Sequence, residues 1–480
     1  MNSTNTNQKE INLNKNNYLL AKWISCFFLL VSILIFLYTY YRAEITFQGT
    51  LDSRYFKYYI LSLGGIAFWG VVIWLRTEIQ ANIVTVIIAL IFGLYAIEGV
   101  LSIMGLGQTE SRAAAAADQG IEFDQRTKLN VIEDLLSDGV DAVPTFHGSQ
   151  LIELLGKNTE DTDYLLPLAG VSNKTTVYNN ESGEYLIYKS DRYGFNNPDN
   201  QWNSKELEWL LTGDSFTHGS GVLSGQEIAA KIRSFDNSSV ISLGIGGNGP
   251  LLEYATLIEY DNILVPENVV WLYFEGNDLN ENLQNEKTIP LLMKYLEDDF
   301  SQNLIHRQKE IDFELETFIA NEKDKAQVQQ QPQLKLYRTR WLRLKAIRKL
   351  LDLDSTKSIK AESELEVNAE DPIFSEILSK TKARVESWGG KLYFVYLPQY
   401  ERYSMKDISH DKFRNKNEVL NVIRGLDIKV IDIHEEVFAN HADPLSLFPL
   451  RLEGHYNADG YEKVSMAIIS KANEQEKNAK

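Results

Sequence analysis

Ser215 is placed where a serine could act as a nucleophile. It lies in residues 211–219 (LTGDSFTHG), directly after an apolar run that predicts a β-strand. In an open parallel sheet, active sites form at the carboxyl ends of strands. A serine preceded by glycine can expose its hydroxyl on a tight turn there, and the following helix offers backbone N–H groups to a developing oxyanion. Taken alone, Asp214 and Ser215 are explained equally well as a helix cap.

Three later blocks carry residue types that could complete such a site. Residues 242–250 (SLGIGGNGP) follow a second apolar run, and their glycines allow a backbone N–H to approach a ligand closely. Residues 274–278 (FEGND) follow a third run, where an asparagine amide can point into the same crevice. Residues 453–460 (EGHYNADG) place His455 at a loop-to-helix junction, from which a general base could reach the serine. Each block alone is also compatible with an ordinary loop or turn.

Together the four blocks resemble the SGNH/GDSL hydrolase superfamily, in the order Gly213, Asp214, Ser215, then Gly247, then Gly276, Asn277, Asp278, then His455. The resemblance covers roughly residues 207–475. It implies that Ser215 attacks an ester carbonyl, while His455 removes the serine proton and later protonates the leaving alcohol. It also implies an oxyanion hole formed by the backbone N–H groups of Ser215 and Gly247 and by the Asn277 side chain.

One position departs from the pattern of this family. The family often carries Asp three residues before the histidine, where this chain has Leu452. Glu453, two residues before His455, is the acid that we expect to orient the imidazole. The alternative is a Ser–His dyad assisted by a backbone carbonyl.

The elements that must position these residues follow an α/β pattern. Short apolar runs alternate with helical stretches, which predicts a parallel sheet with helices on both faces, as in a flavodoxin-like α/β/α domain over residues 207–475. A charged stretch between about 280 and 385 breaks the spacing and predicts a helical insertion. Before this domain, residues 105–206 are expected to form a linker and mixed connector, with a helix at 125–137 and a hairpin near 185–188. The expected strands are residues 207–211, 240–243, 269–274, 391–397 and 429–433.

The N-terminal region predicts a membrane anchor. Residues 1–22 are expected to be a disordered tail, and residues 23–104 to hold three transmembrane helices at 23–41, 58–75 and 83–104, because about 20 apolar residues cross a bilayer. The Lys and Arg residues flanking these spans number four on each side, so their bias does not orient the chain. Glu98 in the third span is interpreted as interfacial, although intramembrane acids can be functional.

Composition limits the classes of partner. The net charge of −18 argues against nucleic acid, which demands a basic surface. The single cysteine, Cys26, excludes an intramolecular disulfide, and no histidine–carboxylate cluster has metal-ligand spacing, so no metal or other cofactor is expected.

Three other features have competing interpretations. His218 follows Ser215 closely but is expected to point elsewhere, and the pair formed by Asp432 and His434 is expected to end a strand. Residues 334–351 form a basic amphipathic pattern. This pattern fits a helix packed on the main domain, an interfacial membrane helix or a patch for an anionic glycan.

The resemblance extends, more narrowly, to membrane-anchored members linked to bacterial surface-polysaccharide loci. It implies hydrolysis or transfer of an acyl ester, expected to be acetyl, on a cell-surface carbohydrate. Such a protein would be a multi-pass protein of the bacterial inner membrane with an extracytoplasmic catalytic domain. Its expected partners are the lipid bilayer and proteins of polysaccharide assembly. The alternative is a non-catalytic glycan-binding module of a polysaccharide-assembly complex.

Overall fold

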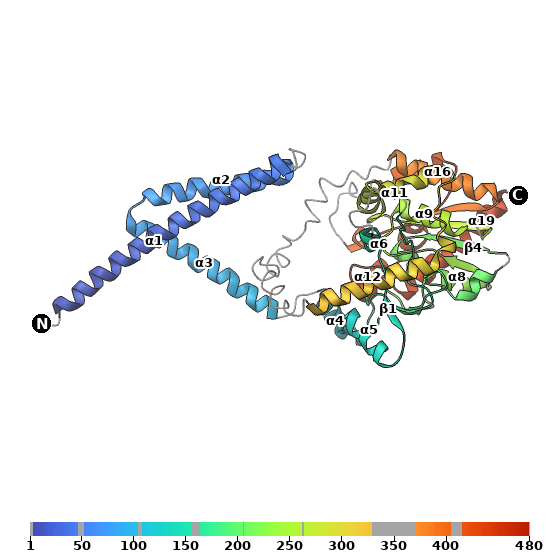
Figure 1. Cartoon of the computed structure of the whole chain (residues 1–480), viewed down its shortest axis with the longest axis horizontal. Coiled ribbons are helices and arrows are strands. Elements are labelled where there is room, and N and C mark those ends of the chain that lie inside the picture. The colour runs from blue at the N-terminus through green and yellow to red at the C-terminus, as the bar shows by residue number, and fades with distance from the viewer. Residues whose placement is uncertain are drawn as a thin grey trace. The chain divides into compact units, whose positions relative to one another are not determined.

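The computed structural model describes residues 3–46, 52–103, 108–154, 164–204, 206–261, 264–328, 371–404 and 415–479. These residues form two compact units, one of N-terminal helices and one α/β domain that begins with the connector (Figure 1). The predicted basic helix at residues 334–351 lies outside the described residues.

The N-terminal unit consists of long helices: α1 (Ser3–Tyr40) with a π-helical turn (Tyr41–Thr46), α2 (Asp52–Trp74) and α3 (Thr77–Ile103). The segment expected to be a disordered tail is instead helical from Ser3 onward. A helix that is already nucleated extends at little cost, so a polar segment can continue an apolar helix.

Two of these helices are long and apolar enough to cross a membrane, through Tyr18–Glu44 and Thr77–Glu98. The apolar part of α2 is shorter, at Tyr58–Trp74, so two of the three predicted spans meet this test of length and composition. Phe28 stacks on Trp69 between α1 and α2 at a ring-centroid distance of 4.9 Å. Most other apolar side chains of the unit are exposed, which marks a surface for membrane or protein contact.

The α/β domain is built on a five-stranded, entirely parallel sheet with strand order β5-β4-β6-β7-β8. In chain order this is 2-1-3-4-5, a common doubly wound order that places a crevice at the carboxyl ends of the first and third strands. Those strands are β4 and β6. The observed bounds are β4 Trp209–Gly213, β5 Val240–Ser242, β6 Asn268–Phe274, β7 Lys391–Leu397 and β8 Lys429–Asp432.

Alternating side chains on the strands fill two cores, one on each face of the sheet. On β4, Leu210 belongs to one core, whereas Trp209 and Leu211 belong to the other. This period of two is the direct consequence of strand geometry. The first core packs under α9 (Pro250–Tyr260), α12 (Gln308–Val328), α16 (Pro372–Ser387) and α18 (Asn415–Gly425), and the second under α8 (Ile228–Asp236) and α19 (Ala458–Ala479).

The region predicted as a helical insertion is mostly helical where it is described, with turns and irregular backbone at residues 287–289 and 297–303. Besides α12 and α16 it contains the short helices α10 (Leu283–Glu286) and α11 (Pro290–Met293). Two more short helices lie at the carboxyl edge of the sheet, α7 (Ser215–His218) after β4 and α17 (Glu401–Ser404) after β7.

The connector forms a second, three-stranded sheet of order β1-β2-β3, in which β2 and β3 are antiparallel, as the predicted hairpin requires. Phe195 and Trp202 of the connector are buried in the first core of the main domain. The connector and the sheet domain are therefore one packed unit. Its elements are α4 (Gln108–Asp118), α5 (Lys128–Ser137), β1 (Ala142–Pro144), α6 (Gly148–Leu154), β2 (Thr175–Val177) and β3 (Ile187–Lys189).

Candidate active site

The turn that carries Ser215 joins β4 to the short helix α7. Asp214 is the N-cap of this helix, and its carboxylate accepts a hydrogen bond from the Phe216 N–H at 2.9 Å. The other oxygen of this carboxylate lies 3.1 Å from Ser215 Oγ. Gly213 has φ +155°, and a Cβ there would collide with Thr217 Oγ1. Only glycine fits this tight turn, which places the Ser215 hydroxyl at the carboxyl edge of the sheet.

His455 connects Ser215 to a carboxylate. Its Nε2 lies 2.7 Å from Ser215 Oγ, and its Nδ1 lies 2.9 Å from Glu181 Oε1. The other Glu181 oxygen accepts the His455 backbone N–H at 2.9 Å. Because Nδ1 faces an ionised acceptor, we assign the proton to Nδ1 and the lone pair to Nε2. The arrangement is that of a nucleophile, a base and an orienting acid.

Glu181, rather than the expected Glu453, is therefore the carboxylate on the imidazole. Glu453 instead offers its backbone carbonyl to Arg112 Nη2, at 2.6 Å. A Cβ built on Gly454 would lie 2.5 Å from Glu181 Oε2 and 2.8 Å from Arg112 Nη2. Glu181 and Arg112 thus already fill the space beside the backbone that leads into His455.

Glu181 comes from the loop between β2 and β3 and is fixed by Arg112 of α4. Arg112 Nη1 donates to the Glu181 carbonyl at 2.9 Å, and Nη2 lies 3.9 Å from Oε2. Ser220 also contacts His455 Nδ1, at 3.0 Å, and Asn179 donates to Ser220 Oγ at 2.6 Å. Residues close to Glu181 in sequence and residues of the α7–α8 loop thus surround the imidazole together.

Glu181 and His455 each stabilise the charged form of the other. Burial tends to raise the pKa of Glu181, but His455 and Arg112 outweigh it and lower that pKa to about 2. Burial tends to lower the pKa of His455, but Glu181 and then Asp214 outweigh it and raise that pKa. The imidazole is consequently a stronger base than a free histidine, which suits removal of a hydroxyl proton.

Gly247 lies in the loop that follows β5, next to β4 in the sheet. Its φ of +78° favours glycine. The loop is braced by Asn282, whose amide donates to the Asn248 carbonyl at 2.9 Å, and by Glu286, whose carboxylate accepts the Gly249 N–H at 2.5 Å. Both braces come from the segment after β6, so the two loops that flank Ser215 are held together.

Asn277 lies in the turn after β6, on the other side of β4. Asp278 closes this turn by accepting the Phe274 N–H at 2.7 Å, and Gly276 packs where a Cβ would collide with the Phe274 ring. Asn277 Oδ1 is buried without a hydrogen-bond partner among the described residues. Burial, followed by the nearby Asp214, raises the pKa of Asp278 well above its usual range.

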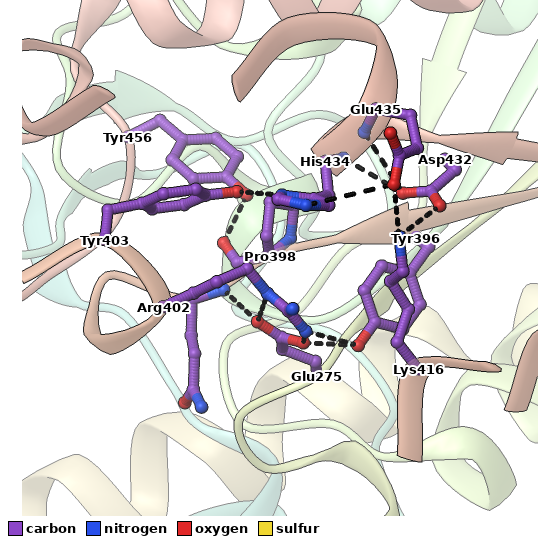
Figure 2. Close-up of polar contacts among 11 residues, drawn as sticks. Glu275, Tyr396, Pro398, Arg402, Tyr403, Lys416, Asp432, His434, Glu435 and Tyr456 are labelled. Atoms are coloured by element: carbon purple, nitrogen blue, oxygen red, sulfur yellow. Dashed lines mark hydrogen bonds and ion pairs between the residues drawn. The ribbon is translucent and has the colours of Figure 1, made fainter. Parts of the chain in front are cut away.

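The residue before Gly276, Glu275, anchors this turn to β7 and α17. Its carboxylate accepts the Gln399 N–H at 2.8 Å and bonds to Arg402 and to the Tyr396 hydroxyl. Figure 2 shows the Arg402 and Tyr396 side chains converging on Glu275. The turn that carries Asn277 is therefore held by a buried ion pair.

The remaining histidine candidates have structural contacts. His218 Nδ1 accepts the Gly246 N–H at 3.2 Å, and its Nε2 lies 2.8 Å from the Tyr188 hydroxyl. His218 thus points away from Ser215 and supports the loop of Gly247. Asp432 ends β8 as expected, and His434 beyond it bonds to the Tyr403 hydroxyl at 2.8 Å (Figure 2).

No group of three or more His, Cys, Asp or Glu side chains within the described ranges is arranged to hold a metal ion. No family model matches the sequence, and no curated protein matches it.

Proposed function

We propose that this chain is a serine esterase or O-acyltransferase of the SGNH/GDSL type. The observation that carries the proposal is the hydrogen-bonded series from Ser215 Oγ to His455 Nε2, at 2.7 Å, and from His455 Nδ1 to Glu181, at 2.9 Å. Supporting it, the series lies at the carboxyl edge of a doubly wound parallel sheet, beside the loops that carry Gly247 and Asn277.

In the proposed reaction, Ser215 Oγ forms a bond to the ester carbonyl carbon while its proton passes to His455 Nε2. The carbonyl oxygen becomes an oxyanion that the N–H groups of Ser215 and Gly247 and the Asn277 amide would stabilise. The C–O bond of the ester then breaks, and His455 returns the proton to the departing alcohol. Water or a sugar hydroxyl next attacks the acyl-serine, and the same imidazole takes the proton from this acceptor. The bond between the acyl carbon and Ser215 Oγ then breaks, and His455 returns the proton to Ser215 Oγ, which regenerates the free serine.

We propose an acylated cell-surface carbohydrate, with acetyl as the acyl group, as the substrate. The likeness of the sequence to polysaccharide-associated members of the superfamily supports this substrate. The candidate spans Tyr18–Glu44 and Thr77–Glu98 support a site held at a membrane. We propose the extracytoplasmic side of the bacterial inner membrane because cell-surface carbohydrates lie on that side. Hydrolase and transferase share the acyl-enzyme step, and analysis of products from a labelled acyl donor with a glycan acceptor would separate them.

The test is covalent labelling of the folded full chain by a fluorophosphonate probe, together with release of 4-nitrophenol from 4-nitrophenyl acetate. We expect Ser215→Ala to abolish both, because the nucleophile is removed. Ser234→Ala is the matched control, since Ser234 lies on α8 and its hydroxyl donates to the Lys231 backbone carbonyl. Undiminished turnover in Ser215→Ala would refute the nucleophile. Absence of labelling in the folded wild type would favour a non-catalytic glycan-binding module.

A further inference from the structure

Lys128 carries a positive charge that no helix-stabilising effect or salt bridge in the described structure explains. It is the first residue of α5, capped by Thr127, and a positive charge at a helix N-terminus is unfavourable for the helix dipole. Among the described residues, its half-buried ammonium makes no hydrogen bond or ion pair. Its polar contact is with the Tyr178 ring, whose centroid is 5.8 Å from Nζ. Neither helix stability nor a salt bridge explains this lysine.

Tyr178 connects Lys128 to the candidate active site. It lies three residues before Glu181, and its ring stacks on His218 at 4.5 Å. A Cβ at Gly246 would collide with the Tyr178 hydroxyl, so the ring lies directly against the glycine loop. Lys128 therefore stands beside the loop of Gly247.

His147 lies on the same side of that loop. Its ring centroid is 5.8 Å from that of Tyr178, and a Cβ built on Gly247 would lie 3.0 Å from its Nδ1. Burial, then the charges of Lys128 and His455, lower the pKa of His147 to about 4, so its imidazole is neutral at pH 7. Burial lowers the pKa of Lys128 to about 8, so its ammonium remains largely charged there. The pair thus offers one cation and one neutral imidazole next to the site.

We propose that Lys128, with His147 beside it, binds a carboxylate on the acylated substrate, so that the substrate is an acidic glycan of the uronate type. This inference rests on the proposed function. The chain carries a net charge of −18, which repels anionic ligands unless a local cation receives them. A carboxylate at Lys128 would form the ion pair that the protein leaves open, in a partly desolvated place where such a pair is strengthened.

The first experiment compares two esters that differ by one carboxylate, 4-nitrophenyl acetate and 3-carboxy-4-nitrophenyl acetate. We expect the full chain to favour the carboxylated ester in kcat/KM, and Lys128→Met to reduce that preference about tenfold while turnover of the neutral ester stays within about twofold. Met keeps the length of the side chain without its charge. Lys391→Met is the matched control, because Lys391 begins β7 at the opposite edge of the sheet and pairs with Glu267. An unchanged preference in Lys128→Met overturns the proposal.

A second measurement separates this inference from the proposed function. Affinity for polygalacturonate and for neutral xylan is measured with Ser215→Ala, which binds without turnover. Adding Lys128→Met should weaken polygalacturonate binding about five- to tenfold and leave xylan binding unchanged. Failure to bind polygalacturonate, or equal affinity in both variants, overturns the carboxylate site. Ester hydrolysis that survives Ser215→Ala would instead overturn the proposed nucleophile.

Discussion

His455 joins residues that are far apart in the chain: its two ring nitrogens contact Ser215 and Glu181, which lie 240 and 274 positions away. The contact with Glu181 assigns the proton to Nδ1, and the contact with Ser215 assigns the lone pair to Nε2. This is the tautomer that a general base needs. The imidazole is also enclosed by Ser220 and by the Phe216 ring at 4.7 Å. A change at Glu181 should therefore alter the base itself without moving the nucleophile.

We predict that Glu181→Gln lowers kcat on 4-nitrophenyl acetate by about 10³- to 10⁴-fold, because the amide no longer fixes and charges the imidazole. Glu453→Gln should remain close to wild type, since the carboxylate on His455 Nδ1 is that of Glu181. Steady-state kinetics of the two variants check this. Full activity of Glu181→Gln, or an equal loss in both variants, would contradict the assignment of the acid.

The pH profile gives an independent check. The base must be neutral, so kcat/KM should rise with pH as His455 loses its proton. Glu181 raises the pKa of His455 against the opposing effect of burial. Removing the carboxylate leaves burial dominant, so the rise of the residual activity of Glu181→Gln should occur at lower pH than in wild type. A shift to higher pH would contradict this sign.

At the residue scale, the sequence predicted the site residues that lie within short local motifs. Ser215 and His455 stand in short blocks beside apolar runs, and the structure brings them together. Glu181 lies in a connector loop, and no spacing in the sequence relates it to the C-terminal histidine. Proximity to His455 in the sequence favoured Glu453 instead. Nothing in the sequence indicated what this connector loop contacts.

Among the elements, the strands were predicted closely because buried parallel strands are continuous apolar runs. β6 was expected at residues 269–274 and spans Asn268–Phe274. β4 was expected at residues 207–211 and spans Trp209–Gly213. Thr212 and Gly213 do not continue the apolar run, yet they pair with β6, so tertiary pairing rather than propensity extends this strand toward Ser215.

The turn after β6 supports a prediction at this scale. Glu275, two residues before Asn277, forms a salt bridge with Arg402. The two side chains are 6% and 10% exposed, respectively. Arg402→Ala leaves a buried carboxylate uncompensated, which typically costs about 3–5 kcal/mol. We also expect a fall in kcat of about tenfold or more with KM little changed, because the loss would displace Asn277, the proposed oxyanion donor, whose amide would act mainly in the transition state.

Thermal unfolding and steady-state kinetics measure the two effects, and Arg402→Lys should restore part of the activity. Lys416→Met is the control, since Lys416 pairs with Asp432 and Glu435 in the neighbouring part of the network (Figure 2). Reduced stability with unchanged kcat in Arg402→Ala would show that the pair supports the fold alone.

At the scale of the whole molecule, the α/β unit has its own cores and contains every residue of the candidate site. We therefore predict that a variant lacking residues 1–104 folds and hydrolyses 4-nitrophenyl acetate within about twofold of the full chain. Loss of residues 105–206 should abolish folding and activity together, because this segment supplies Glu181 and buries Phe195 and Trp202 in the main core.

The N-terminal helices should determine where that activity is located. The full chain should float with phospholipid vesicles in a density gradient, since Tyr18–Glu44 and Thr77–Glu98 each satisfy the length and hydropathy of a membrane span. The variant lacking residues 1–104 should remain with the soluble fraction, carrying the esterase activity with it. If both proteins stayed soluble, the apolar helices would not be a membrane anchor. If the truncated protein still floated, the membrane contact would lie in the α/β unit itself.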